Sequence, residues 1–244
     1  MNQVDQNHHQ DNKQDLVNHT ALQVLIPHIH SYALKGLTVL KSGGKKVPAT
    51  PVEIYAIGVF ERVSELDAAL VSLRMALGFV MELGSSQQPD PKVYRYHYEN
   101  FVLRVMGFVD RAYRLVGSAL FIDKAKLEAI GGNTHVGKTV QADHPDVHTA
   151  LERVTTVVKN YRGPRNELIH SAAYSSRELS VFMYIRDFGM DTKGIDVEEL
   201  AQSHYSQGVE EIRLSIKGLA EAITNLLDAL APLFTLADAN QSAV

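Results

Sequence analysis

The amino-acid sequence predicts an all-α protein, an up-and-down helical bundle of four to five long helices with a small irregular or β-prone insertion. Three observations support this fold class. Apolar residues recur with spacings of three and four along several long segments, which is typical of helices that bury one face. Short stretches rich in Gly, Pro and Ser separate these segments. The stripes are narrow, so each helix needs neighbours, and antiparallel packing at about 20° buries them together.

Both ends of the chain are expected to lie outside the bundle, which should occupy residues 52–236. Residues 1–18 are rich in Asn, Gln, Asp and His and predict a disordered tail, while residues 237–244 form a C-terminal tail. Residues 19–51 form an N-terminal extension. Within it, the mixed pattern from Leu22 to Leu40 favours a short helix or strand, and a Gly- and Pro-containing loop follows.

The first two long helices are predicted at residues 52–83 and 92–121, with a linker at 87–91 between them. Each has a continuous apolar stripe with helical spacing. The stripe of the first helix comprises Val59, Val63, Leu66, Leu70, Leu73, Leu77 and Val80. The stripe of the second helix comprises Tyr94, Tyr98, Phe101, Val105, Phe108, Ala112, Leu115 and Ala119.

The second half of the chain is predicted to begin with a loop at residues 131–143 and a third helix at 145–163. A short helix should follow. Residues 179–185 alternate and are rich in β-branched and aromatic side chains, so this segment is the β-prone insertion. The last helix has the longest stripe, which comprises Tyr205, Val209, Ile212, Ile216, Leu219, Ile223, Leu226, Leu230 and Leu233.

Composition restricts the function classes. The chain has 244 residues and no Cys, which excludes disulfide and thiolate chemistry and fits a cytoplasmic protein. Its formal net charge of −4 argues against a general nucleic-acid binder, so any RNA contact should be local. The N-terminus lacks the apolar core of a signal peptide. The most apolar stretch, residues 218–237, is interrupted by polar residues, so no membrane-spanning segment is expected.

The residues with the clearest chemical potential are Arg165, Asn166 and His170, which follow the helix break Gly163-Pro164. Pro is favoured at the first position of a helix, which would place Arg165 and Asn166 in its first turn. Asn166 and His170 are four residues apart and share a face. A guanidinium group matches phosphate oxygens, and an imidazole can give and take protons near neutral pH. This combination suits a phosphodiester substrate.

The spacing of Arg165, Asn166 and His170 resembles the hallmark motif of the HEPN superfamily of helical proteins, in which Arg and a polar residue precede His by three variable positions. Similar motifs occur in toxins, abortive-infection proteins, anticodon nucleases and type VI CRISPR effectors. The resemblance implies metal-independent RNA cleavage, with two motifs facing each other across a homodimer. Some toxin relatives place Tyr two residues beyond the His, where this chain has Ala172.

The resemblance implies a HEPN-type endoribonuclease that leaves 2′,3′-cyclic phosphate and 5′-hydroxyl ends and acts as a toxin or antiviral defence effector. His170 would move protons, Arg165 would stabilise charge on the phosphoryl oxygens, and Asn166 would hold the imidazole or a phosphate oxygen. No metal or cofactor is expected. Besides RNA and a second copy of the chain, an antitoxin or sensor protein is a candidate partner. The alternative is a non-catalytic module that binds a nucleotide or a protein.

Four further residues are candidate RNA contacts. Arg162 precedes the motif and could bind a phosphate. Arg104 and Arg111 are seven residues apart on one helix face, where they could border an RNA groove or form a solvated, salt-bridged face. Tyr174 could stack on a base or pack in the interior.

Two other patterns in the sequence point to different chemistry. Gly132 to Thr139 matches the phosphate-binding P-loop string, but a P-loop needs a buried strand before it and a helix that starts at Lys138. Neither is expected here, so the string is interpreted as a Gly-rich loop, and a P-loop phosphotransferase is the less favoured alternative. Histidines near the N-terminus lack the regular ligand spacing of a zinc module. They are His8, His9, His19, His28 and His30.

Overall fold

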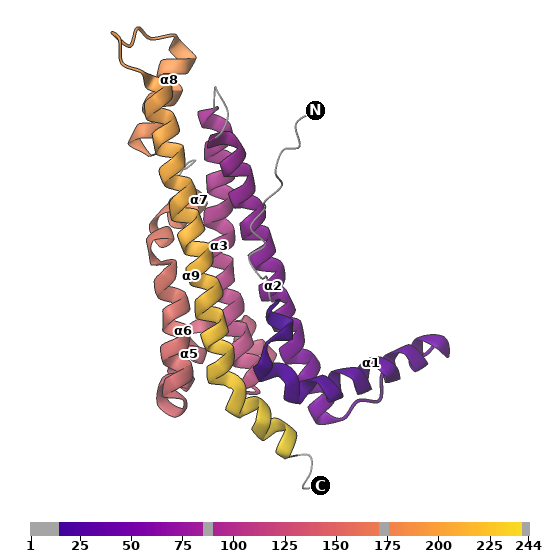
Figure 1. The fold of residues 1–244 in the computed structure, drawn as a ribbon. Helices are drawn as coiled ribbons and strands as arrows, with labels where there is room; N and C mark the ends of the chain where they lie inside the picture. The colour runs from indigo at the N-terminus through magenta and orange to yellow at the C-terminus, as the bar shows by residue number, and fades with distance from the viewer. Residues whose placement is uncertain (1–14, 85–89, 171–175, 241–244) are drawn as a thin grey trace.

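A computed structural model describes residues 15–84, 90–170 and 176–240, and the regular secondary structure in these ranges is all helical. This confirms the predicted all-α fold class. Three long helices run along the length of the molecule (Figure 1): α2 (Pro51–Gly84), α3 (Pro91–Ala119) and α9 (Val197–Ala239). α2 packs on both α3 and α9, and α6 (Pro145–Val157) packs along α9.

The predicted apolar stripes form the core of this bundle. The whole predicted stripe of α3 is buried, as is that of α2 except for Leu77, which is partly buried. In α9, Val209 and Leu233 are partly buried and the other stripe residues are buried. The three-and-four spacing therefore identified the inward face of each long helix, because side chains three and four apart lie on one side.

Part of the apolar surface of α9 lies in this core. α9 is the one helix in the described ranges that is long and apolar enough to cross a membrane by length and composition, and the expectation that no segment spans a membrane stays a prediction. Leu219, Ile223 and Leu226 are fully buried within the bundle, where α9 contacts α2 and α6. Packing in the protein interior accounts for these apolar residues.

The N-terminal extension begins as part of the bundle. Two short 3-10 helices, η1 (Leu16–Asn18) and η2 (Thr20–Leu25), lie against α2 and α9. The backbone N–H of Leu16 donates to Asp67 Oδ1 at 2.8 Å, and Leu25 is fully buried. The predicted tail therefore does not extend through residues 15–18, and residues 1–14 lie outside the described residues.

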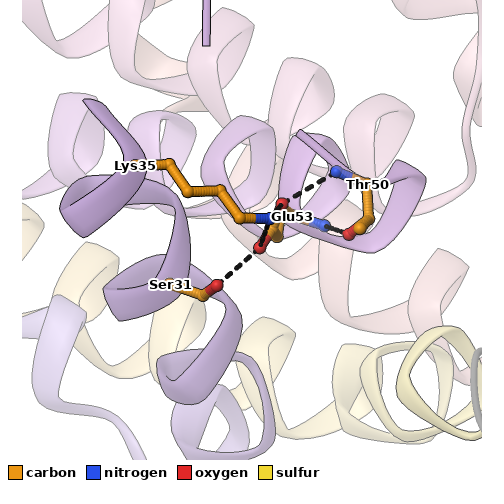
Figure 2. Close-up of polar contacts among 4 residues, drawn as sticks. All are labelled: Ser31, Lys35, Thr50 and Glu53. Carbon is orange, nitrogen blue, oxygen red and sulfur yellow. Dashed lines mark hydrogen bonds and ion pairs between the residues drawn. The ribbon is translucent and has the colours of Figure 1, made fainter. Parts of the chain in front are cut away.

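The helix-or-strand alternative for the rest of the extension is settled in favour of helix. α1 (Ile26–Lys41) projects sideways from the bundle (Figure 1). Glu53, only 3% exposed, joins α1 to the start of α2 (Figure 2). Its carboxylate accepts hydrogen bonds from Lys35 Nζ at 2.7 Å, Ser31 Oγ at 2.6 Å and the Thr50 N–H at 2.8 Å. These bonds lower the pKa of Glu53 from 4.5 to about 2.

The β-prone prediction for residues 179–185 was wrong, because this segment lies inside α8 (Arg177–Phe188). Ser176 caps the helix by accepting a hydrogen bond from the Leu179 N–H at 3.1 Å, and Gly189 ends it with φ 58°. Leu179 and Phe182, three residues apart, are buried. The caps and this helical pair outweighed the β propensity of the neighbouring residues.

The loop predicted at residues 131–143 was also wrong. A short helix, α4 (Lys124–Glu128), leads to Gly131 at φ 85° and then to α5 (Gly132–Asp143). Val136 and Val140, one turn apart, are buried and pack α5 against the rest of the bundle. The P-loop-like string therefore lies within a helix that starts at Gly132, where Lys138 is in the middle. No strand precedes it in the described part of the chain, so the P-loop interpretation does not fit.

The helix break before the motif comes earlier than expected. α6 ends at Val157, a 3-10 turn η3 (Lys159–Tyr161) follows, and α7 (Arg162–His170) begins at once. Arg165 is thus the fourth residue of α7, beyond the predicted first turn. Pro164 is tolerated as the third residue because the first four N–H groups of a helix have no partner within it.

Candidate active site

α7 packs against α3 and is held by one residue that precedes the motif and one that lies within it. Just before α7, the Tyr161 ring is buried and lies edge-on to Phe101, with ring centroids 5.3 Å apart. The Tyr161 hydroxyl is 2.9 Å from Ser215 Oγ of α9. Leu168, within α7, packs against the core. Tyr161 and Leu168 therefore orient the helix so that its polar residues point outward.

The three motif side chains are open to solvent. Arg165 is half-buried, whereas Asn166 and His170 are exposed. Arg165 Nη1 donates to Asn166 Oδ1 at 3.3 Å, so the guanidinium and the amide lie side by side. Asn166 and His170 are one helical turn apart on the same face. None of the three is sealed beneath apolar neighbours.

Arg165 and Asn166 line an open cavity of about 610 Å³, hereafter the α5 cavity, between α3, α5, α6 and the start of α7. Arg162 lines it as well, together with Lys138 of α5 and Lys159 of η3. His170 is not among its described lining residues. One subunit therefore brings the guanidinium and amide of the motif to the cavity but leaves the imidazole outside it.

The α5 cavity is electropositive although the chain is acidic overall. Its lining includes four permanent cations, Lys138, Lys159, Arg162 and Arg165, against two carboxylates, whereas the whole chain has a formal net charge of −4. The carboxylates hold the cavity walls together: Asp110 Oδ1 accepts from Asn133 Nδ2 at 2.7 Å, and Glu152 Oε1 accepts from the Tyr113 hydroxyl at 3.4 Å.

The other predicted RNA contacts have different positions. Arg104 Nε donates to Asn100 Oδ1 at 2.6 Å, and Arg111 Nη1 donates to the Gly107 carbonyl at 2.9 Å, so both side chains lie along α3. Neither is among the described residues that line the α5 cavity. Their RNA contacts stay predictions, as does that of Tyr174, which lies outside the described residues.

Sequence reasoning did not assign Lys138, Lys159 or Tyr113 to the site. Lys138 belongs to the P-loop-like string, and Lys159 lies three residues before Arg162 without a recognisable pattern. Tyr113 comes from α3, far away in the sequence, and burial raises the pKa of its hydroxyl. No local signal could have joined these three residues to the motif.

The described residues contain no group of three or more His, Asp or Glu side chains positioned to hold a metal ion. The polar groups of the α5 cavity are instead suited to anions. Guanidinium and ammonium groups bind phosphate through charge-assisted hydrogen bonds, and Arg can bind two oxygens at once.

Comparison with known proteins identifies a family. The family model described as Cthe2314-like HEPN matches residues 45–231, which is more than half of the chain. The match includes α2 to α8, most of α9 and the whole motif. No protein with a curated description matches the chain, and no solved structure does.

Proposed function

The chain belongs to the Cthe2314-like HEPN family, and from this premise we propose that it is a metal-independent endoribonuclease. One observation carries the proposal: Arg165 and Asn166 of the motif line an open, electropositive cavity, and His170 is exposed one turn beyond Asn166. A guanidinium group that stabilises negative charge and an imidazole that transfers protons are the groups that cleavage of an RNA phosphodiester requires, and both lie on one helix.

The proposed chemistry is an internal transesterification. The 2′-hydroxyl oxygen of the RNA attacks the adjacent phosphorus while one imidazole removes its proton. Arg165 stabilises the negative charge that builds up on the phosphoryl oxygens. The bond to the 5′-oxygen breaks, and a protonated imidazole donates a proton to that oxygen. The products are a 2′,3′-cyclic phosphate and a 5′-hydroxyl.

In this scheme a homodimer supplies the two imidazoles. Each subunit contributes one His170, and a two-fold axis brings identical surfaces together. Within one subunit the described lining of the α5 cavity includes His148 but not His170, so in this proposal the contact between two subunits brings a His170 to each site. Ile169, beside His170, is 48% exposed and provides apolar surface for such a contact.

The decisive experiment measures RNA cleavage in EDTA. We expect wild-type protein to cut single-stranded RNA, whereas Arg165→Ala and His170→Ala abolish cutting without lowering the melting temperature. Arg153→Ala and His135→Ala are matched controls, because both residues are exposed and neither is among the described lining of the α5 cavity. RNA with 2′-deoxy linkages should resist cleavage. Normal cutting by both motif variants would exclude this site.

In cells, such an enzyme would act in the cytoplasm as a toxin or antiviral effector, under the control of an antitoxin or sensor protein. Expression of the wild-type chain should arrest growth, and His170→Ala should relieve the arrest. Equal arrest by the two proteins would argue against a nuclease-based toxin.

The second candidate function is a non-catalytic module that binds a nucleotide or a protein. The low overall charge favours it, since the cationic surface at the α5 cavity is local. Stable nucleotide or protein binding without RNA loss over long incubation would support this function over the nuclease.

A further inference from the structure

The P-loop-like string is used in this structure as one wall of the α5 cavity. Five residues of α5 line it at spacings that put them on one side of the helix. They are Asn133, Thr134, Gly137, Lys138 and Gln141. The adjacent side of α5 is anchored by the buried Val136 and Val140. The string thus presents amide, hydroxyl and ammonium groups to the cavity from a fixed helix.

Facing α5 is an aromatic ring. Tyr113 of α3 is half-buried in the cavity wall, and the neighbouring lining residues Met106 and Val109 are apolar. A Cβ atom added at Gly137 would lie 3.7 Å from Tyr113 Cε1. Gly is disfavoured inside helices. Gly137, in the middle of α5, leaves open the space beside the Tyr113 ring that a larger side chain would fill.

The cations that line the cavity come from two of its walls. Lys159, Arg162 and Arg165 come from η3 and α7, and Lys138 comes from α5. The cavity volume of about 610 Å³ is in the range of small-molecule sites. A half-buried aromatic ring, amide groups and several cations lining one cavity are together the chemistry that recognises a base linked to a phosphate.

We infer that the α5 cavity binds a nucleoside phosphate, with the phosphate near Lys138, Arg162 and Arg165 and the base beside Tyr113. The assignment to an RNA strand rests on the proposed function: Arg165 belongs both to this cavity and to the motif, so the bound unit is the nucleotide next to the scissile phosphate. α5 then helps to select and position the substrate, and Lys138 is a binding residue.

Binding can be measured separately from cleavage. The probe is a fluorescent single-stranded oligoribonucleotide in which 2′-O-methyl groups replace the attacking hydroxyls, and the full-length chain is titrated into it. Lys138→Ala should weaken binding about tenfold and reduce its salt dependence, because one phosphate contact is lost. Gly137→Leu should weaken binding at least as much by filling the space beside Tyr113.

Two matched variants serve as controls. Lys126→Ala removes an exposed lysine of α4, and Gly58→Leu enlarges a helical glycine that has no atoms within 4 Å of an added Cβ. Neither residue is among the described lining of the cavity, so both variants should bind like wild type. Melting curves show whether each protein is folded. Lys138 is exposed, so its truncation tests the site even if Gly137→Leu proves unstable.

Adenosine 5′-monophosphate and inorganic phosphate as competitors identify the source of the ligand. Competition by the mononucleotide at concentrations where phosphate alone has no effect supports a nucleoside-phosphate site. Tighter binding of the oligonucleotide assigns that site to a strand, and tighter binding of the mononucleotide assigns it to a free nucleotide. Wild-type affinity in both Lys138→Ala and Gly137→Leu overturns the inference.

The same variants separate this inference from the nuclease proposal. If the chain never cuts RNA but binds the probe through Lys138 and Gly137, the nuclease proposal fails and the binding site stands. If the chain cuts RNA and both cavity variants bind and cut normally, the nuclease stands and the binding site fails. If both hold, Lys138→Ala should raise KM about tenfold and leave kcat nearly unchanged.

Discussion

Two polar clusters at different places in this molecule show how burial and charge balance separate a structural role from a ligand-binding one. At the base of α1, the Glu53 carboxylate is enclosed and accepts hydrogen bonds from Lys35, Ser31 and Thr50. In the α5 cavity, four permanent cations stand against two carboxylates and remain open to solvent. The first cluster is satisfied by the protein itself, whereas the second has an excess of charge that an anion can neutralise.

The largest expected effect is the loss of RNA cleavage caused by Arg165→Lys in the α5 cavity. This change keeps the positive charge but removes the planar fork that binds two phosphate oxygens. We expect RNA cleavage to fall about a hundredfold with the melting temperature unchanged. Initial cleavage rates at saturating RNA measure the effect. Full activity in this variant would show that charge alone is needed.

Glu53→Ala should lower stability but not RNA cleavage, which is the opposite of Arg165→Lys, because it disrupts the enclosed hydrogen bonds around Glu53. The variant leaves Lys35 and Ser31 without their shared acceptor, and we expect the free energy of unfolding to fall by about 2 kcal/mol. Urea denaturation provides the measurement, and cleavage by the folded variant should stay normal. Glu65→Gln is the control: Glu65 pairs with Arg62 but its side chain is 41% exposed, so the loss should be below about 1 kcal/mol.

The hydrogen bonds of Glu53 also predict that the stability of the protein depends on pH. The pKa of Glu53 is about 2 in the folded protein and 4.5 as its ordinary value. Because folding depresses this pKa, the contribution to stability is present above pH 4.5 and is lost as pH falls toward 2. Urea midpoints at pH 7 and pH 3 should therefore differ more for wild type than for Glu53→Gln. Equal differences would show that the carboxylate is not specially stabilised.

The smallest effect is expected for Gly137→Ala in the cavity wall. Ala favours the helix over Gly by about 1 kcal/mol, and the added Cβ meets Tyr113 Cε1 at an ordinary contact distance of 3.7 Å. The melting temperature should therefore rise slightly, as it should for Gly58→Ala in α2. A drop confined to Gly137→Ala would show that the cavity tolerates no added atom beside the ring.

Particular segments show how far sequence patterns predict this fold. The stripes of α2, α3 and α9 were predicted well because long helices with one buried face leave a strong periodic signal. The predictions for α5 and α8 were wrong because these helices are short, and their Gly-rich or β-prone composition obscures a brief pattern. In α8, the Ser176 cap and the buried pair of Leu179 and Phe182 decide the outcome.

The sequence by itself determined the long helices, their inward faces and the motif from Arg165 to His170, because all of these depend on residues close together in the chain. Only the tertiary structure decided that Tyr113, Lys138 and Lys159 share a cavity with Arg165. They come from α3, α5 and η3, and packing of the helices brings them together. No local pattern encodes that arrangement, because it depends on how separate helices meet in space.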